Sequence, residues 1–145
     1  MALKGSGSDV ASSFITAAAA DADGISTAAS ISGAANLTIG GALASGGSVT
    51  MDSPRNVTIL SAGDDSGITF TVTGTDESNE AQTEVITGAD TGTATGSSFF
   101  QTVTQIATSG SSAGNVSAGS GTSCSGVISA SRCRLRGIYV VNGSS

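Results

Sequence analysis

The stretch that most constrains the fold is GDDSGITFTVTGTDESNEAQTEVITGA, residues 63–89. Threonine and large apolar residues alternate from Ile68 to Thr75, with a period of two. Successive side chains of a strand point to opposite faces, so this pattern is typical of a strand with one buried and one solvated face. A polar turn at 77–80 leads into a second stretch of this kind, 82–87, and together they predict a β-hairpin.

The same period recurs at short intervals along much of the chain. Further strands are expected at residues 36–40, 47–51, 56–60, 97–108, 114–118, 125–129 and 132–141. The apolar positions within 97–108 break strict alternation, which predicts a bulge or a helical turn inside that strand. Short strands separated by Gly, Ser and Asp turns are typical of an antiparallel β-sandwich, Ig-like, or of a small barrel. The fold is therefore predicted to be mainly β.

The domain organisation follows from where the alternation begins. Residues 1–35 are small and Ala-rich and lack a convincing apolar period, which predicts an N-terminal arm, either extended or with a short helix capped by Ser8 or Asp9. The β-sandwich domain is expected to fill residues 36–145. Within it, 132–145 is expected to be a C-terminal strand that pairs within the chain or in trans.

The supply of large apolar side chains is small for a chain of 145 residues. Ile, Leu, Val and Phe number 29, against 44 Ser and Thr and 21 Gly. Ordering the backbone costs ~1–2 kcal/mol per residue, and this core has little to set against that cost. The domain is therefore expected to gain stability from copies of itself or from a larger assembly.

The residue inventory disfavours catalysis. The chain has no His and a single Lys, Lys4, so neither a His-activated nucleophile nor a His-based zinc site can be built. The acids at 76–84 resemble a calcium loop, but Ala81 stands where that loop needs Gly and Thr87 where it needs Glu. These acids are predicted to bond the backbone of their own turn. No enzyme activity, cofactor or metal site is expected.

Two cysteines, Cys124 and Cys133, are separated by eight residues. Two interpretations stay open. The pair could close a hairpin disulfide, or both residues could be small buried hydrophobic side chains that stay reduced.

Charge is distributed unevenly along the chain. All 11 acids lie within residues 1–123, whereas 124–145 carries Arg132, Arg134 and Arg136 and no acid. On a strand these three side chains share one face, and Tyr139, the sole tyrosine, points to the other. Nucleic-acid binding would require more cations and stacking aromatics. The arginines are therefore predicted to form an interface strip that meets carboxylates of another strand or subunit.

Targeting signals are absent from the sequence pattern. The N-terminal residues lack the 7–15-residue apolar run of a signal peptide, and nothing approaches the ~20 apolar residues of a membrane span. Neither a membrane nor a nucleic acid is expected as a partner.

Two stretches resemble a known kind of protein. SPRNVTILSAGDDSGITFTVTGTDESNEAQTEVITGADTGTATGSSFF (53–100) resembles a Thr/Gly-rich β module of small virion structural proteins of tailed bacteriophages, especially marine phages. RLRGIYVVNGSS (134–145) resembles a strand of the same kind of protein. In such modules the hairpin turn usually contains Gly, and here Asn79 is expected to supply the positive φ instead.

The resemblance implies a function in the virion. It implies a capsid decoration (cement) protein first, and a neck or tail component second. The partners would be copies of itself and other virion proteins, either the major capsid protein or neck and tail proteins. The protein would be located in the virion after assembly in the host cytoplasm. From another class, a bacterial surface or adhesion β module that binds glycan is the alternative.

Overall fold

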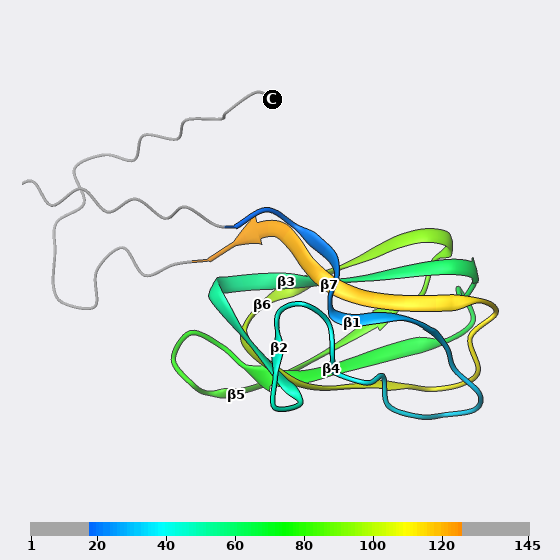
Figure 1. Ribbon diagram of the computed structural model, residues 1–145, viewed down its shortest axis with the longest axis horizontal. Helices are drawn as coiled ribbons and strands as arrows, with labels where there is room; N and C mark the ends of the chain where they lie inside the picture. The colour runs from blue at the N-terminus through cyan, green and yellow to red at the C-terminus, as the bar shows by residue number, and fades with distance from the viewer. Residues whose placement is uncertain (1–17, 126–145) are drawn as a thin grey trace, which may run out of the picture. The chain divides into compact units, whose positions relative to one another are not determined.

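The computed structural model describes residues 18–125, and all its regular elements in this range are β-strands (Figure 1). In chain order they are β1 (Asp21–Ser30), β2 (Ala44–Ser45), β3 (Ser48–Asp64), β4 (Thr69–Thr75), β5 (Ala81–Thr87), β6 (Asp90–Thr108) and β7 (Asn115–Cys124). All strand pairings are antiparallel. The prediction of a mainly β, antiparallel fold is confirmed, while the choice between a sandwich and a small barrel stays a prediction.

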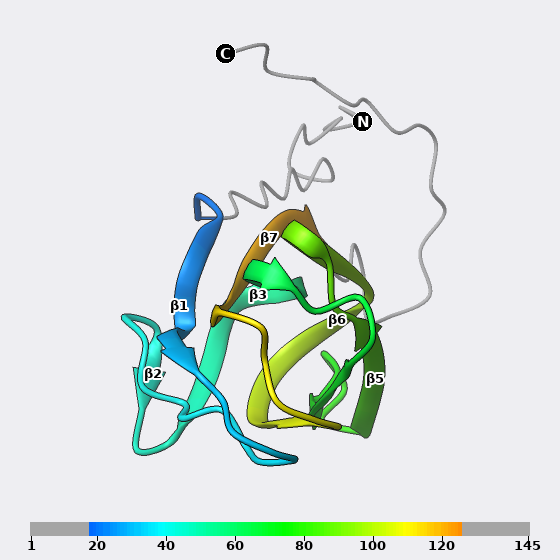
Figure 2. The same ribbon diagram turned by 90° about the vertical axis from the view of Figure 1, so that its right-hand side faces the viewer.

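The strands form one hydrogen-bonded sheet in the order β1-β7-β3-β6-β4-β5, with β2 paired to β3. The sheet curls, so that its strands surround a common interior (Figure 2). The segment 35–43, which precedes β2, is hydrogen-bonded to two of these strands, β6 and β1. The amide of Leu37 donates to the carbonyl of Ile106 in β6 (2.8 Å), and the amide of Leu43 donates to the carbonyl of Gly24 in β1 (2.8 Å).

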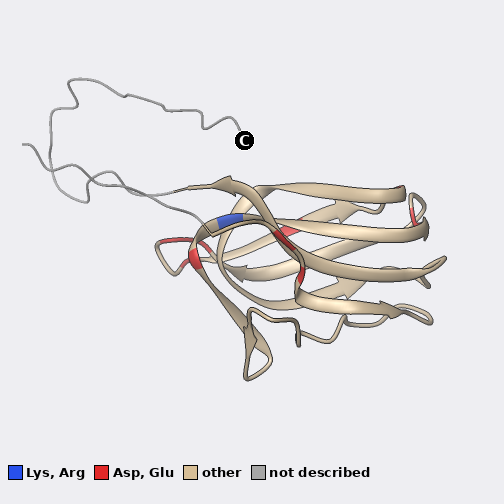
Figure 3. Cartoon of the chain, turned by 45° about the horizontal axis from the view of Figure 1, so that its top comes forward, with Lys and Arg blue, Asp and Glu red and all other residues tan. Residues whose placement is uncertain are grey.

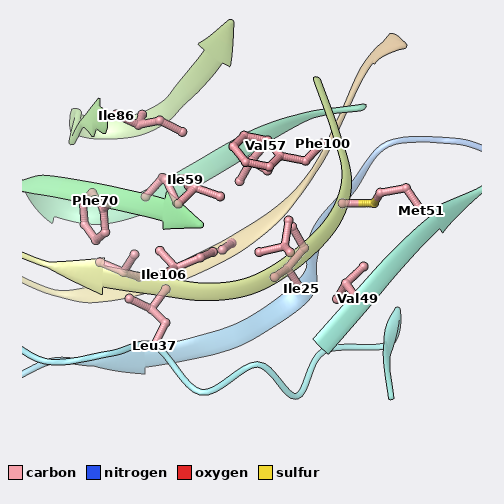
Figure 4. Packing of buried hydrophobic residues seen from close by; sticks show 14 residues of the cluster. Ile25, Leu37, Val49, Met51, Val57, Ile59, Phe70, Ile86, Phe100 and Ile106 are labelled. Atoms are coloured by element: carbon pink, nitrogen blue, oxygen red, sulfur yellow. The ribbon is translucent and has the colours of Figure 1, made fainter. Parts of the chain in front are cut away.

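The interior is filled by 14 buried apolar side chains (Figure 4). They are Ile25, Leu37, Val49, Met51, Val57, Ile59, Phe70, Val72, Ile86, Phe100, Val103, Ile106, Val116 and Ala118. Six of the seven strands contribute, so the few large apolar residues of the chain are concentrated in one cluster. In β4, Phe70 and Val72 are fully buried and the intervening threonines are half-buried, which confirms the predicted alternation.

Two long strands, β3 with 17 residues and β6 with 19, bend through bulges. The register between them shifts from Thr50 to Arg55, around Pro54. Proline has no amide to give to a ladder, and its carbonyl accepts instead from the amide of Ser125 (2.8 Å). The expected strands at 47–51 and 56–60 are therefore one continuous strand. The irregularity predicted within 97–108 is confirmed as a bulge, because β6 skips a residue opposite the step from Thr73 to Gly74.

The expected boundary of the N-terminal arm at residue 35 is wrong, because β1 occupies residues 21–30. Ile25 is the only large apolar residue of β1, so no apolar period marks the strand. The strand is held by antiparallel pairing with β7. The hydroxyl of Ser117 donates to the carbonyl of Ala22 (3.1 Å), and the missing side chain of Gly119 leaves room for the backbone of Asp21 and Ala22.

The expected strand at 36–40 is also corrected. Asn36 forms an isolated bridge with Ala107, and no strand is assigned over 36–40. The local pattern of Leu37 and Ile39 is real, since Leu37 is buried and Ile39 packs against the core. The glycines at 40 and 41 then turn the chain toward β1, where both amides donate to the carbonyl of Ile25.

The turn between β4 and β5 has the chemistry expected from its sequence. Asn79 adopts a positive φ of 66°, as predicted. One carboxylate oxygen of Asp76 accepts hydrogen bonds from the amides of Ser78 (2.8 Å) and Glu80 (3.0 Å). This acid therefore bonds the backbone of its own turn, which confirms that interpretation at Asp76.

Replacing Asp76 with alanine is expected to lower the free energy of unfolding by ~1–2 kcal/mol, because two turn amides lose their acceptor. Urea denaturation followed by circular dichroism measures this loss. Asp76→Asn keeps a side-chain oxygen and is expected to retain most of the stability. If the two variants were equally destabilised, the negative charge rather than the acceptor would be the stabilising property.

Candidate interaction surfaces

The described part of the chain is acidic. Residues 18–125 contain ten Asp and Glu and a single cation, Arg55 (Figure 3). Several of these acids are engaged with backbone amides. Asp65 is buried and accepts from the amide of Ala113 (2.7 Å), and exposed Asp64 accepts from the amide of Ser66 (3.0 Å). Such acids hold loops in place.

Arg55 lies in β3 and is buried. Its guanidinium donates to the carbonyl of Ala18 and, at 3.4 Å, to that of Ala19. Asp52 completes the arrangement, because its carboxylate accepts from the amide of Ala18 (2.8 Å) and lies 3.9 Å from the guanidinium of Arg55. We call this group, Asp52 and Arg55 with the backbone of 18–19, the Arg55 clasp. It fixes the chain just before β1.

The carboxyl group of Asp52 is expected to titrate below its ordinary value. The hydrogen bond from the amide of Ala18 lowers its pKa most, and the amide of Ser53 and the charge of Arg55 lower it further. A lowered pKa in the folded state means that this contribution to stability is present above the unfolded pKa, 3.8, and is lost as the pH falls through the folded value.

An NMR titration is therefore expected to place the pKa of Asp52 below 3.8, with the protection factor of the Ala18 amide against hydrogen exchange falling as Asp52 protonates. Asp64 offers a comparison on the surface, since the hydroxyl and amide of Ser66 lower its pKa. In the variant Asp52→Asn, the titration of Asp64 should persist, and the protection of the Ala18 amide against hydrogen exchange should no longer depend on pH in this range. An Asp52 pKa at or above 3.8 would contradict the clasp.

The outer edge of β5 is a second surface. Two hydrogen bonds bracket the β4–β5 ladder, from the amide of Asp76 to the carbonyl of Glu80 and from the amide of Gly88 to the carbonyl of Ile68 (both 3.0 Å). Pairing in an antiparallel ladder alternates, so the even-numbered residues of β5 bond to β4. The backbone groups of Ala81, Thr83, Val85 and Thr87 then face away from β4. Within residues 18–125 no strand pairs with this edge.

The side chains of these four residues are exposed, and Val85 is the most exposed large apolar side chain, at 62%. The charge of β5 is turned away from them. One oxygen of Glu84 accepts from the amides of Ser97 (2.6 Å) and Ser98 (3.2 Å) on β6, so the carboxylate is held against the neighbouring strand. The outer edge of β5 is therefore apolar at its centre, and its outward backbone donors and acceptors pair with no strand of residues 18–125.

An uncharged groove of about 310 Å³ lies beside the start of β1. Its walls include the side chains of Thr58, Thr93, Thr95 and Thr122. Asn56, at one side, donates to the carbonyl of Gly96 (3.4 Å). The lining offers hydroxyl and amide groups without a charge or an aromatic ring, so it favours neutral hydrogen bonding.

The predicted cysteine and arginine sites fall at the end of the described range. Cys124 is exposed at the end of β7, so the interpretation of this residue as a buried hydrophobic side chain is wrong. Its register partner on β3 is Arg55. Cys133, the three arginines Arg132, Arg134 and Arg136, and the expected strands at 125–129 and 132–141 lie outside the described residues, apart from Ser125.

Other site types were sought within residues 18–125. This range contains no group of three or more His, Cys, Asp or Glu residues placed to hold a metal ion. It also contains no helix long and apolar enough to cross a membrane.

Sequence reasoning missed both the Arg55 clasp and the β5 edge. A signal existed for each. Pro54 and Arg55 stand where the alternation of apolar residues breaks between Met51 and Val57, which marks a position with special backbone and charge requirements. In β5 the usual alternation of apolar residues inside and polar residues outside is inverted at two positions. Val85 lies on the exposed face with Thr83 and Thr87, while Glu84 lies on the inner face.

No family model, curated protein or solved structure matches this chain.

Proposed function

We propose that the chain is a structural protein of a tailed-bacteriophage particle, and specifically a capsid decoration protein that stabilises the shell. The observation that carries this proposal is the outer edge of β5, a seven-residue strand that has exposed Val85 at its centre and pairs on this side with no strand of the described range. Strand edges of this kind pair with other chains. A protein that acts by assembly needs such a surface more than it needs a reacting centre.

The acidic surface supports the same function. Ten acids against one cation make the described range strongly acidic, and a net charge far from zero favours solubility. The curled sheet supplies a rigid body, and its acids are largely used to fix turns. The resemblance of residues 53–100 and 134–145 to virion modules of tailed phages indicates the kind of assembly.

The test is to locate the chain in purified particles. Mass spectrometry of gradient-purified virions is expected to find it in a fixed ratio to the major capsid protein, and a cryo-EM map is expected to place its strand-rich body at repeated sites on the head. Density confined to the neck or tail would contradict the capsid assignment and favour the neck or tail component. Absence from purified particles would contradict a virion function altogether.

A further inference from the structure

As far as residues 18–125 show, the edge of β5 lacks the devices by which proteins protect exposed strands. Natural edges are blunted by Lys or Pro, by bulges or by a covering segment. The sequence of β5, AQTEVIT, contains neither Lys nor Pro. Its register with β4 runs without a shift from Thr69–Thr87 to Thr75–Ala81, so the strand is regular over its whole length. Its one charged residue, Glu84, is turned toward β6. This edge is therefore suited to accept an added strand.

We infer that the outer edge of β5 accepts residues 132–141 of a neighbouring copy of this chain as an added strand. This inference rests on the proposed function in one respect, because strand exchange between copies would link decoration proteins on a shell. Residues 132–141, RCRLRGIYVV, lie outside the described range and enter the argument through their sequence alone.

Charge complementarity favours residues 132–141 over a second β5 strand as the partner of the β5 edge. The hairpin that presents the edge carries Asp76, Glu77, Glu80 and Glu84 and no cation. A second β5 strand would bring four further acids of its hairpin and no cation, so it offers these acids no complementary charge. Residues 124–145 carry three arginines and no acid, so they are the complementary piece of the chain.

The same charges indicate the direction of the added strand. In a parallel arrangement, 132–136 would run beside the acidic turn at 76–80. The apolar residues Ile138 and Val140 would then follow the face on which Val85 is exposed. A parallel partner also places the opposite face of the segment, with Leu135 and Tyr139, on the side of Ile86 and the core. Both faces of the segment therefore match the faces of β5.

The connection between β7 and residues 132–141 is long enough to reach the edge of β5. β7 is separated from β5 in the sheet by β3, β6 and β4, a path of roughly 19 Å at ~4.8 Å per step. The seven residue steps from Ser125 to Arg132 span at most ~25 Å when fully extended. The connection is therefore long enough for either pairing, and the concentration dependence of association distinguishes a neighbouring copy from the same copy.

The decisive variant is Val85→Pro in the full chain. Because the amide of Val85 faces the free edge, proline removes an outer donor without removing a bond to β4, and Val85→Thr is the matched control that keeps the amide. We expect the wild-type chain to self-associate in analytical ultracentrifugation, with weaker association at higher salt. We expect Val85→Pro to raise the Kd about tenfold or more and Val85→Thr to leave it nearly unchanged.

A second variant keeps the inference testable if Val85→Pro disturbs the hairpin. The double variant Arg134→Glu, Arg136→Glu leaves the described residues intact, and we expect it to weaken association by at least a similar factor. Adding Glu77→Arg and Glu80→Arg to it reverses both sides of the pairing and is expected to restore association. Hydrogen exchange at Thr83, Val85 and Thr87 should slow only in the associated state.

Three results would overturn the inference. The first is association that is unchanged in both Val85→Pro and the arginine double variant. The second is a wild-type chain that stays monomeric at every concentration and salt. The third is protection of the β5 edge that is independent of concentration, which would mean pairing within one copy. These measurements use the purified chain, so they are independent of whether the protein is later found on particles.

Discussion

Replacing Phe70 with alanine is expected to lower the free energy of unfolding by ~3–5 kcal/mol, the usual cost of truncating a fully buried aromatic side chain. Phe70 is 0% exposed and lies in β4, opposite Ile86 of β5. The core has only 14 apolar side chains, so few neighbours are available to fill the cavity. Because domains of this size are stable by ~5–15 kcal/mol, the variant should be largely unfolded at moderate urea concentrations.

Urea denaturation at low protein concentration and high salt isolates the fold from association through β5. The matched control is Val85→Ala on the paired strand, where 62% of the side chain is exposed and the expected change is within ~0.5 kcal/mol. A loss below ~1 kcal/mol in Phe70→Ala would contradict the assignment of Phe70 to the centre of the core.

The β4–β5 hairpin could be predicted because its determinants are local. The alternation of Thr with Phe70 and Val72, the turn chemistry of Asp76 and the positive φ of Asn79 all lie within a few residues of one another. When local pattern and turn chemistry agree, the sequence alone specifies the element. The bulge in β6 was predictable for the same reason, since it follows from the spacing of apolar residues along one strand.

β1 could not be predicted, because what makes it a strand is distant in the sequence. Its hydroxyl contact from Ser117 to Ala22 spans 95 residues, and the close approach at Gly119 is visible only once β7 lies beside it. With Ile25 as its one large apolar residue, the segment carries no period of its own. Small side chains that suggest an arm in isolation are what allow two backbones to approach here.

The sequence signals at the two surfaces could not show what lies opposite them, for a related reason. Whether a strand is an edge depends on the order of the whole sheet, so Val85 alone could not reveal that its backbone is free. The Arg55 clasp joins residues of β3 to the backbone at 18–19, and nothing near Ala18 in the sequence indicates that carbonyls there will receive a guanidinium. Local patterns thus predicted elements, while interactions between distant elements decided the surfaces.

Replacing Arg55 with methionine is expected to lower the free energy of unfolding by ~2–3 kcal/mol. Hydrogen bonds from charged groups contribute ~1.5–3 kcal/mol, and the carbonyls of Ala18 and Ala19 lose their donor. Methionine roughly preserves the volume, so the loss reports hydrogen bonding more than packing. Arg55→Ala adds a cavity and should be worse. Asp52 is 42% exposed and stays hydrated in these variants, so its carboxylate adds little to the cost.

Hydrogen exchange identifies where the stability is lost. If the clasp anchors the start of β1, exchange in Arg55→Met should accelerate from Ala18 to Ile25 before it does so in β4. Arg55→Lys separates charge from geometry, because an ammonium group keeps the charge but cannot reproduce the fork of a guanidinium. We expect Lys to recover only part of the loss. An Arg55→Met variant as stable as the wild type would contradict this account. The buried guanidinium, whose Nε has no partner, would then contribute no net stability to the fold.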